Sequence, residues 1–85
     1  MLMTKLTVQL PRGLQARHTT IFVSKASSFK SEIILAKNGR SSDGKKIMKV
    51  MDLSVKEGDE IILMVNGIDE HVANKTLKKF LLNIS

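Results

Sequence analysis

Residues 6–18 read Leu-Thr-Val-Gln-Leu-Pro-Arg-Gly-Leu-Gln-Ala-Arg-His and join two different hydrophobic periodicities. In the first half, Leu6, Val8 and Leu10 alternate with polar residues, which predicts a strand with one buried face. The proline and the glycine that follow end this strand, because proline lacks a backbone donor and glycine frees the backbone. A new element is therefore expected to begin in the second half of the stretch.

This new element has helical spacing. From Ala16 onward, apolar residues recur at Phe22, Ala26 and Phe29, which are four and then three residues apart. The spacing places these side chains on one face and predicts a helix that runs to about Ser28.

The next segment predicts a hairpin. Ile33 and Leu35 alternate with their neighbours as in a strand, and Asn38-Gly39 follows them. This dipeptide is a strong hairpin signal because both residues accept positive φ angles. The return strand, about Arg40 to Asp43, is short and polar, so we expect it at an edge of the sheet.

Three more elements are predicted in the second half of the chain. Residues 47–53 suit a short helix, and residues 60–65 form a strand rich in Ile, Leu and Val. Asp69 is a good N-cap for a last helix. The apolar face of this helix is predicted to comprise Val72, Ala73, Thr76, Leu77, Phe80 and Leu81.

The predicted order is therefore β-α-β-β-α-β-α within one domain, residues 1–85. Such interleaving indicates an α+β fold in which helices pack on one face of a mostly antiparallel sheet. The chain has no cysteine, which excludes disulfides, thiolate nucleophiles and Cys-based metal sites. No stretch reaches the ~18 consecutive apolar residues of a membrane span, and residues 1–10 lack the apolar core of a signal peptide. We expect a cytoplasmic protein with no membrane insertion.

Charge is the unusual part of the composition. Fourteen Lys and Arg residues against eight Asp and Glu residues give a net charge of +6. Such a charge favours acidic proteins, phosphorylated ligands or nucleic acid as partners, or else it belongs to an ordinary solvated surface. Nucleic acid is disfavoured, because the chain has no tyrosine or tryptophan for base stacking and its three phenylalanines fall at core-like positions.

Two local motifs carry a resemblance to a known family. The first is Gly13-Leu14-Gln15-Ala16-Arg17 at the strand-to-helix junction, and the second is Lys46-Ile47-Met48-Lys49-Val50-Met51 in the short helix. Together with the order of the elements, they resemble HPr, the histidine phosphocarrier of the bacterial phosphotransferase system, over essentially the whole chain. The resemblance implies an open-faced β-sandwich, a four-stranded antiparallel sheet covered on one face by three helices.

The sequence departs from the family at the residues that carry its chemistry. The resemblance places Gln15 at the position of the phosphorylated histidine, and an amide has no nucleophilic lone pair at neutral pH. It places Lys46 at the position of the regulatory serine, which removes the hydroxyl and gives the wrong charge for a phosphoserine mimic. The catabolite-repression HPr-like proteins (Crh) also carry glutamine at the first position, but they normally keep the serine. His18 replaces a family proline and is the one residue near this site able to accept a phosphoryl group.

The junction is a candidate anion-binding site. Free backbone N–H groups at a helix start and the helix dipole favour an anion. Arg17 adds a fork of donors suited to phosphate or carboxylate. We therefore expect Gln15, Ala16, Arg17 and His18 to bind phosphate or sulfate without reacting, unless they form an ordinary helix start. The two histidines lack metal-ligand spacing, so no metal and no cofactor are expected.

A docking surface is expected beside this junction. By analogy with the family, its centre comprises Arg17, Ile47, Met48 and Met51. Methionine is adaptable and common at such surfaces, although both methionines suit a core equally well. Val50 and Leu53 are expected in the core.

Three functions remain open from the sequence. The first is an HPr-like protein that is no enzyme, is not phosphorylated, and regulates proteins with acidic or apolar docking surfaces, such as phosphotransferase components or a transcription regulator. The second is an active phosphocarrier with His18 as the acceptor. The third is a polyanion binder that uses Lys45, Lys46, Lys49, Lys75, Lys78 and Lys79. A homodimer formed through the N-terminal strand is also open.

Overall fold

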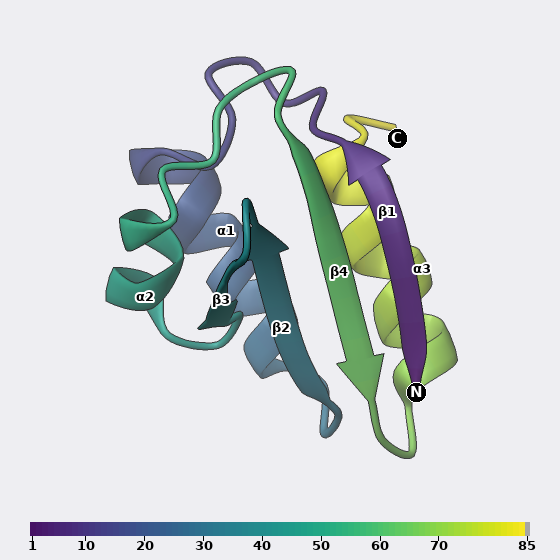
Figure 1. The fold of residues 1–85 in the computed structure, drawn as a ribbon. Coiled ribbons are helices and arrows are strands. Elements are labelled where there is room, and N and C mark those ends of the chain that lie inside the picture. Colours follow the sequence, from purple (N-terminus) through teal and green to yellow (C-terminus); the bar gives the residue numbers. More distant parts are fainter. Residues whose placement is uncertain (85) are drawn as a thin grey trace.

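A computed structural model describes residues 1–84 of the chain. Its seven elements follow the predicted order β-α-β-β-α-β-α (Figure 1). The elements are β1 Leu2–Thr7, α1 Ala16–Ser27, β2 Glu32–Lys37, β3 Arg40–Asp43, α2 Ile47–Asp52, β4 Glu60–Asn66 and α3 Glu70–Leu81.

The four strands form one antiparallel sheet in the order β1-β4-β2-β3. The last strand of the chain lies inside the sheet, since Leu63 of β4 pairs with Thr4 on one side and with Leu35 on the other. The short, polar β3 lies at an edge, as predicted. Helices α1 and α3 cover one face, and α2 lies beside α1 near β3, so the opposite face stays open (Figure 1).

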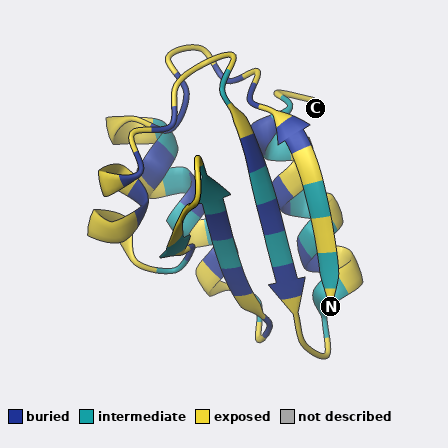
Figure 2. Cartoon of the chain, in the orientation of Figure 1, coloured by how far each residue is buried: buried dark blue, intermediate teal, exposed yellow. Residues whose placement is uncertain are grey.

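One hydrophobic core lies between the sheet and the helices. Buried and less buried residues alternate along β4 and along β2 up to Ala36, which produces the alternating bands in Figure 2. Each fully buried apolar side chain contributes about 1.5–3 kcal/mol relative to exposure. The buried strand residues are Ile33, Leu35, Ile61, Leu63 and Val65, and they meet Phe22, Ala26, Ala73, Leu77 and Leu81 of the helices.

The first strand lies nearer the N-terminus than its predicted position at residues 6–10. The ladder between β1 and β4 ends at Thr7. The apolar residues beyond it are buried, as their spacing predicts, but their backbone is irregular. The N–H of Gln9 bonds to the carbonyl of Leu81 at 2.9 Å, so the chain leaves the sheet and passes the end of α3. Alternation predicts which side chains are buried, whereas the hydrogen-bond partner decides where the strand ends.

Helix α3 buries a narrower face than predicted. Ala73, Leu77 and Leu81 are fully buried, whereas Val72 is 53% exposed. The apolar face predicted for this helix therefore includes one residue, Val72, that the structure leaves exposed. Position 72 is rotated by about 100° from position 73 around the helix, which turns its side chain to solvent.

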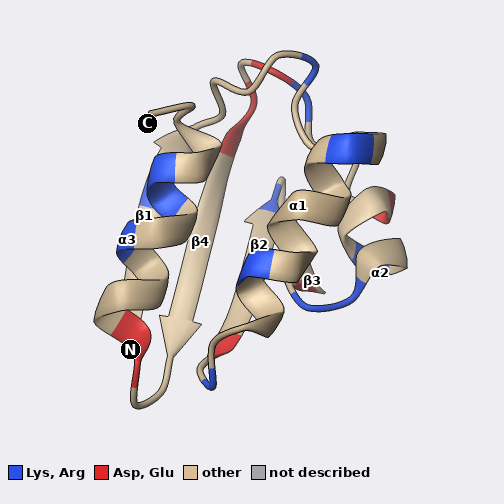
Figure 3. Ribbon diagram, turned by 180° about the vertical axis from the view of Figure 1, so that it is seen from behind, with Lys and Arg blue, Asp and Glu red and all other residues tan. Residues whose placement is uncertain are grey.

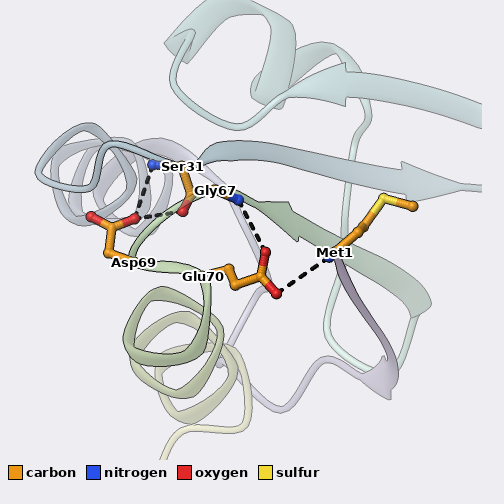
Figure 4. A network of polar contacts seen from close by, with 5 residues as sticks. All are labelled: Met1, Ser31, Gly67, Asp69 and Glu70. Atoms are coloured by element: carbon orange, nitrogen blue, oxygen red, sulfur yellow. Dashed lines mark hydrogen bonds and ion pairs between the residues drawn. The ribbon is translucent and has the colours of Figure 1, made fainter.

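Asp69 occupies the N-cap position of α3, as predicted, but its side chain makes no capping hydrogen bond. Its carboxylate instead accepts hydrogen bonds from the backbone N–H and the hydroxyl of Ser31 (Figure 4). The neighbouring Glu70 reaches back and accepts a hydrogen bond from the N–H of Gly67 at 3.1 Å. The start of α3 is therefore tied to the connection between α1 and β2.

Candidate docking surface on α1 and α2

Helix α2 turns three apolar side chains to solvent. Ile47 is 39% exposed, Met48 66% and Met51 44%. We call these three residues the α2 patch. Val50 of the same helix and Leu53 just beyond it are buried, as predicted. Both methionines thus lie at the surface.

Two polar contacts from β3 hold α2 in place. The guanidinium of Arg40 donates to the carbonyl of Asp52 at 3.1 Å, and the hydroxyl of Ser42 donates to the carbonyl of Lys49 at 2.9 Å. A helix of six residues is unstable alone, so these contacts and the burial of Val50 position the α2 patch. The contact of Arg40 follows a general rule, because a cation is stabilising near the C-terminus of a helix. Neither partner is predictable from local sequence, because both contacts join separate elements.

The first turn of α1 lies beside α2 in both views (Figures 1 and 3). Gln15 is the N-cap and makes no side-chain capping bond, and the first turn contains no acidic residue. Ala16 has a φ of 41°, in the left-handed region, which costs a non-glycine residue about 1–2 kcal/mol. Gln15 and Arg17 are exposed. The α1 start and the α2 patch therefore share one side of the molecule.

His18 is half-buried and makes contacts within the fold. Its Nδ1 atom lies 3.2 Å from the carbonyl oxygen of Gly13, and because a carbonyl only accepts, Nδ1 carries the proton in this contact. The imidazole meets the ring of Phe80 edge-on, with centroids 6.1 Å apart. Its backbone N–H bonds to the carbonyl of Gln15 at 3.0 Å. Of the four predicted anion-binding residues, His18 is thus the one whose donors are already engaged.

Lys46 is the N-cap of α2 and is exposed. Its side chain makes no capping bond, and the first turn of α2 has no acidic residue. A lysine at this end of a helix is unfavourable by on the order of 0.3–1 kcal/mol. The start of α2 is therefore cationic and without a hydroxyl at its N-cap.

The six lysines considered as a polyanion-binding surface fall into two groups. Helix α2 and the loop before it carry one group, and α3 carries the other. Figure 3 shows α2 and α3 on opposite sides of α1. Lys45 is also engaged, since its Nζ donates to the carbonyl of Phe29 at 2.7 Å. One continuous patch of all six does not form, because α1 lies between the two groups.

A surface hollow of about 420 Å³ lies elsewhere, between the tip of the β2–β3 hairpin and the start of β4. Two ion pairs line it: Lys37 Nζ lies 2.8 Å from the Asp59 carboxylate, and Lys5 Nζ lies 3.4 Å from that of Glu60. The hydrogen bond from Lys37 holds the pKa of Asp59 below its usual value. This hollow does not coincide with any residue predicted to act in binding.

Within residues 1–84, no helix is long and apolar enough to cross a bilayer. The same residues contain no group of three or more His, Asp or Glu side chains placed to hold a metal ion.

The sequence profile of the family described as "PTS HPr component phosphorylation site" matches residues 2–83. The chain belongs to the HPr family. It is 39% identical over 80 residues to the HPr-like protein Crh of Bacillus subtilis, covering 94% of each chain. It is also 39% identical over 83 residues to the phosphocarrier protein HPr of Xylella fastidiosa strain Temecula1, covering 98% of this chain and 93% of that one.

Solved HPr structures share the fold. The crystal structure of HPr-C-His from Thermoanaerobacter tengcongensis superposes with a TM-score of 0.93 at 31% identity, covering 100% of this chain and 99% of that one. The crystal structure of Crh from Bacillus subtilis, described as a domain-swapped dimer, gives a TM-score of 0.79 at 37% identity and covers 98% and 95%. The resemblance inferred from the two motifs and the open-faced sandwich are both confirmed.

Proposed function

We propose that this HPr-family protein is a regulatory, non-phosphorylatable variant that binds other proteins through Arg17 and the α2 patch. The observation that carries the proposal is the exposure of three apolar side chains on a helix of six residues. Full burial of such a side chain is worth about 1.5–3 kcal/mol, and these three forgo the part of it that corresponds to their exposure, which favours a binding role. Phosphoryl transfer is carried by other members of the family and is not ascribed to this chain.

The chemistry of two positions supports the loss of phosphorylation. Gln15 presents an amide where the family motif has its phosphorylated histidine. This side chain is exposed and makes no capping hydrogen bond to α1. Lys46 presents an ammonium group at the N-cap of α2, where the family motif has a serine. Neither group accepts a phosphoryl group at neutral pH.

The partner classes that fit this surface are phosphotransferase components or a transcription regulator with an acidic or apolar docking surface. The apolar α2 patch suits an apolar partner surface, and the cationic starts of α1 and α2 suit neighbouring carboxylates. The net charge of +6 would mainly speed encounter with such partners. Because such partners act inside the cell, we also propose that the protein is cytoplasmic.

The alternative of a phosphocarrier that uses His18 has less support. With Nδ1 donating to Gly13, the lone pair of the neutral ring is on Nε2, and phosphorylation at Nδ1 would require loss of that hydrogen bond. The ring also packs against Phe80. An acceptor needs to reach its donor in line, and a half-buried ring held by two contacts is poorly placed for this.

A phosphotransfer assay tests the non-phosphorylatable part of the proposal. The protein is incubated with enzyme I and labelled phosphoenolpyruvate, and separately with labelled ATP and the serine kinase that acts on HPr. We expect no label in either reaction, while an HPr that keeps both motif residues is labelled in both. Enzyme I-dependent label that disappears in His18→Ala would establish the carrier function instead. Label from the kinase would point to Ser41 or Ser42.

A binding assay tests the docking part. Enzyme I is titrated against the full chain, and Met48→Ala/Met51→Ala is expected to weaken binding by about tenfold or more. Met3→Ala is the matched control, since this methionine is 60% exposed on β1, which forms the sheet edge opposite to β3 and α2 (Figure 1). Equal affinities for the three proteins would contradict the assignment of the α2 patch.

We also propose that the α1 start binds phosphate or sulfate through Gln15, Ala16, Arg17 and His18, with His18 contributing least because its Nδ1 and its backbone N–H are already bonded within the fold. Support comes from the exposed, uncapped helix start without an acidic residue in its first turn. Titration with phosphate is expected to shift the amide resonances of Ala16 and Arg17 most, because the N–H of His18 is already bonded. Unchanged amide resonances at millimolar phosphate would contradict the proposal of an anion-binding site at the α1 start.

A homodimer through β1 is a further proposal. Strand β1 lies at a sheet edge, with its second side unpaired among residues 1–84. The related Crh of Bacillus subtilis is described as a domain-swapped dimer. Light scattering over a range of concentrations is expected to show a dimer, and a monomer at all concentrations would contradict it.

A further inference from the structure

Helix α3 carries a second exposed surface that the proposed function does not use. Val72, Lys75 and Lys79 are exposed, and Leu82, the C-cap residue just beyond the helix, is half-buried and packs partly against the core. At about 100° per residue, Val72, Lys75 and Lys79 fall within about 30° of one direction, opposite the buried face of the helix, and Leu82 continues this row at the end of the helix. We call these four residues the α3 stripe.

The C-terminal half of the stripe borders a groove of about 320 Å³. The backbone after the helix shapes this groove: Asn83 has a φ of 59°, and its N–H bonds to the carbonyl of Phe80 at 3.0 Å. The N–H of Ile84 bonds to the carbonyl of Lys79 at 2.9 Å, which completes a Schellman motif. This motif holds Ile84 at the groove with 54% of its surface exposed.

The groove carries charge of one sign. Lys75, Lys78 and Lys79 line it, and all three are exposed. The ion pairs of residues 1–84 involve none of these lysines. The only acidic residue of α3 is Glu70 at its start, so the red and blue parts of this helix are separated in Figure 3. The alkyl stems of the lysines extend the apolar floor between the three ammonium groups.

A second copy of this chain does not suit the stripe. In an antiparallel twofold pairing of two stripes, Lys75 of each copy would face Lys79 of the other. In a parallel pairing, each lysine would face its own equivalent. Both arrangements bring like charges together at the centre of the interface, which is unfavourable. The complement is a helix with carboxylates opposite the lysines and apolar side chains opposite Val72 and Leu82.

We propose that the α3 stripe and its groove form a second docking surface, separate from the α2 patch, for an acidic amphipathic helix of another protein. The spacing of three, four and three residues along the stripe is that of a helix–helix seam. The lysines select an acidic partner, and Ile84 and Leu82 receive its apolar side chains. Because α1 separates α3 from α2, both surfaces are available at the same time (Figure 3).

The test uses the full chain, labelled with nitrogen-15, and a synthetic helical peptide with leucine at the a and d positions and glutamate at e and g. Amide shifts are expected to centre on residues 72–84. Lys75→Glu/Lys79→Glu is expected to weaken binding by about tenfold or more. The matched control is Lys49→Glu/Lys56→Glu, which gives the same net charge of +2 (+6 less 4) and is expected to bind almost like the parent chain.

Three outcomes would overturn the proposal: equal loss of binding in both double variants, equal binding of a scrambled peptide, or shifts centred on α2. Vesicles of phosphatidylglycerol and phosphatidylcholine serve as a further probe. Shifts on α3 with these vesicles but not with the peptide would assign the surface to an anionic membrane instead. The α2 variants are measured separately, so failure here leaves the proposed function unaffected.

Discussion

Asp69 and Ser31 are joined by two hydrogen bonds although 38 residues separate them in the chain. One carboxylate oxygen accepts both the hydroxyl and the backbone N–H of Ser31, the latter at 2.9 Å. The other oxygen accepts the N–H of Lys30 at 2.8 Å. Hydrogen bonds to an ionised acceptor are roughly twice as strong as neutral ones. This carboxylate therefore joins the start of α3 to the segment that leads into β2.

Stability is expected to fall as the pH drops below about 4. The hydroxyl of Ser31 first, and then the N–H of Lys30, lower the pKa of Asp69 below its ordinary 3.8. The pKa values of Glu70 and Asp59 are shifted in the same direction. Because these carboxyls bind protons more tightly in the unfolded chain, their contribution is present at neutral pH and is lost as the pH falls through the folded values. Urea unfolding at a series of pH values measures this loss.

The variant Asp69→Asn identifies the main source of this pH dependence. Its unfolding midpoint is expected to be lower than that of the parent at pH 7 and to change less on acidification. Asp52→Asn is the control, since the side chain of Asp52 makes no hydrogen bond or ion pair within residues 1–84. An unaltered pH profile in Asp69→Asn would show that Asp69 is not the residue responsible.

Substitution of Gly13 by alanine is expected to cost about 3 kcal/mol or more of stability. Gly13 has a φ of 67°, and an added Cβ would overlap the carbonyl of Val55, which accepts the hydrogen bond from the N–H of Leu14. Gly39→Ala is the matched control. Its φ of 79° is equally left-handed, but nothing lies within 4 Å of the added Cβ, so about 1–2 kcal/mol is expected. Similar losses by thermal or urea unfolding would contradict the close approach of the backbone at Gly13.

The variant Gln15→His is expected to acquire enzyme I-dependent phosphorylation. The N-cap of α1 is exposed, uncapped and next to Arg17, so an imidazole there has access to a phosphoryl donor. The measurement is acid-labile label from phosphoenolpyruvate, with Gln15→Asn as a control that supplies no nucleophile. A variant that stays unlabelled while folded would show that more than one residue separates this chain from the carriers.

Truncation of two residues of α2 is expected to affect the stability of the protein to very different extents. Val50→Ala removes a fully buried side chain and is expected to destabilise the protein by about 2 kcal/mol. Met48→Ala removes an exposed one and is expected to change stability by no more than about 0.5 kcal/mol. Urea unfolding of both variants, followed by titration with enzyme I, separates folding from binding. Destabilisation by Met48→Ala would place this methionine in the core.

The local pattern of the sequence was sufficient for the order and type of the elements. The hairpin at Asn38-Gly39, the edge position of β3 and the alternating burial in β2 and β4 follow from turn chemistry and side-chain periodicity. These are short-range effects, because a residue's φ preference and its face of a strand depend on near neighbours. Belonging to the HPr family was likewise readable from two motifs and is confirmed.

The tertiary structure decided what local pattern leaves open. Strand β1 ends at Thr7 because the next residues bond to other elements, and the carboxylate of Asp69 bonds to Ser31 instead of capping its own helix. Met48 is exposed because the packing of α2 and its anchors from β3 turn Val50 to the core, and position 48 lies about 200° from position 50 around the helix. Each of these depends on a partner distant in the chain, and such partners are defined only when the sheet and helices have packed together.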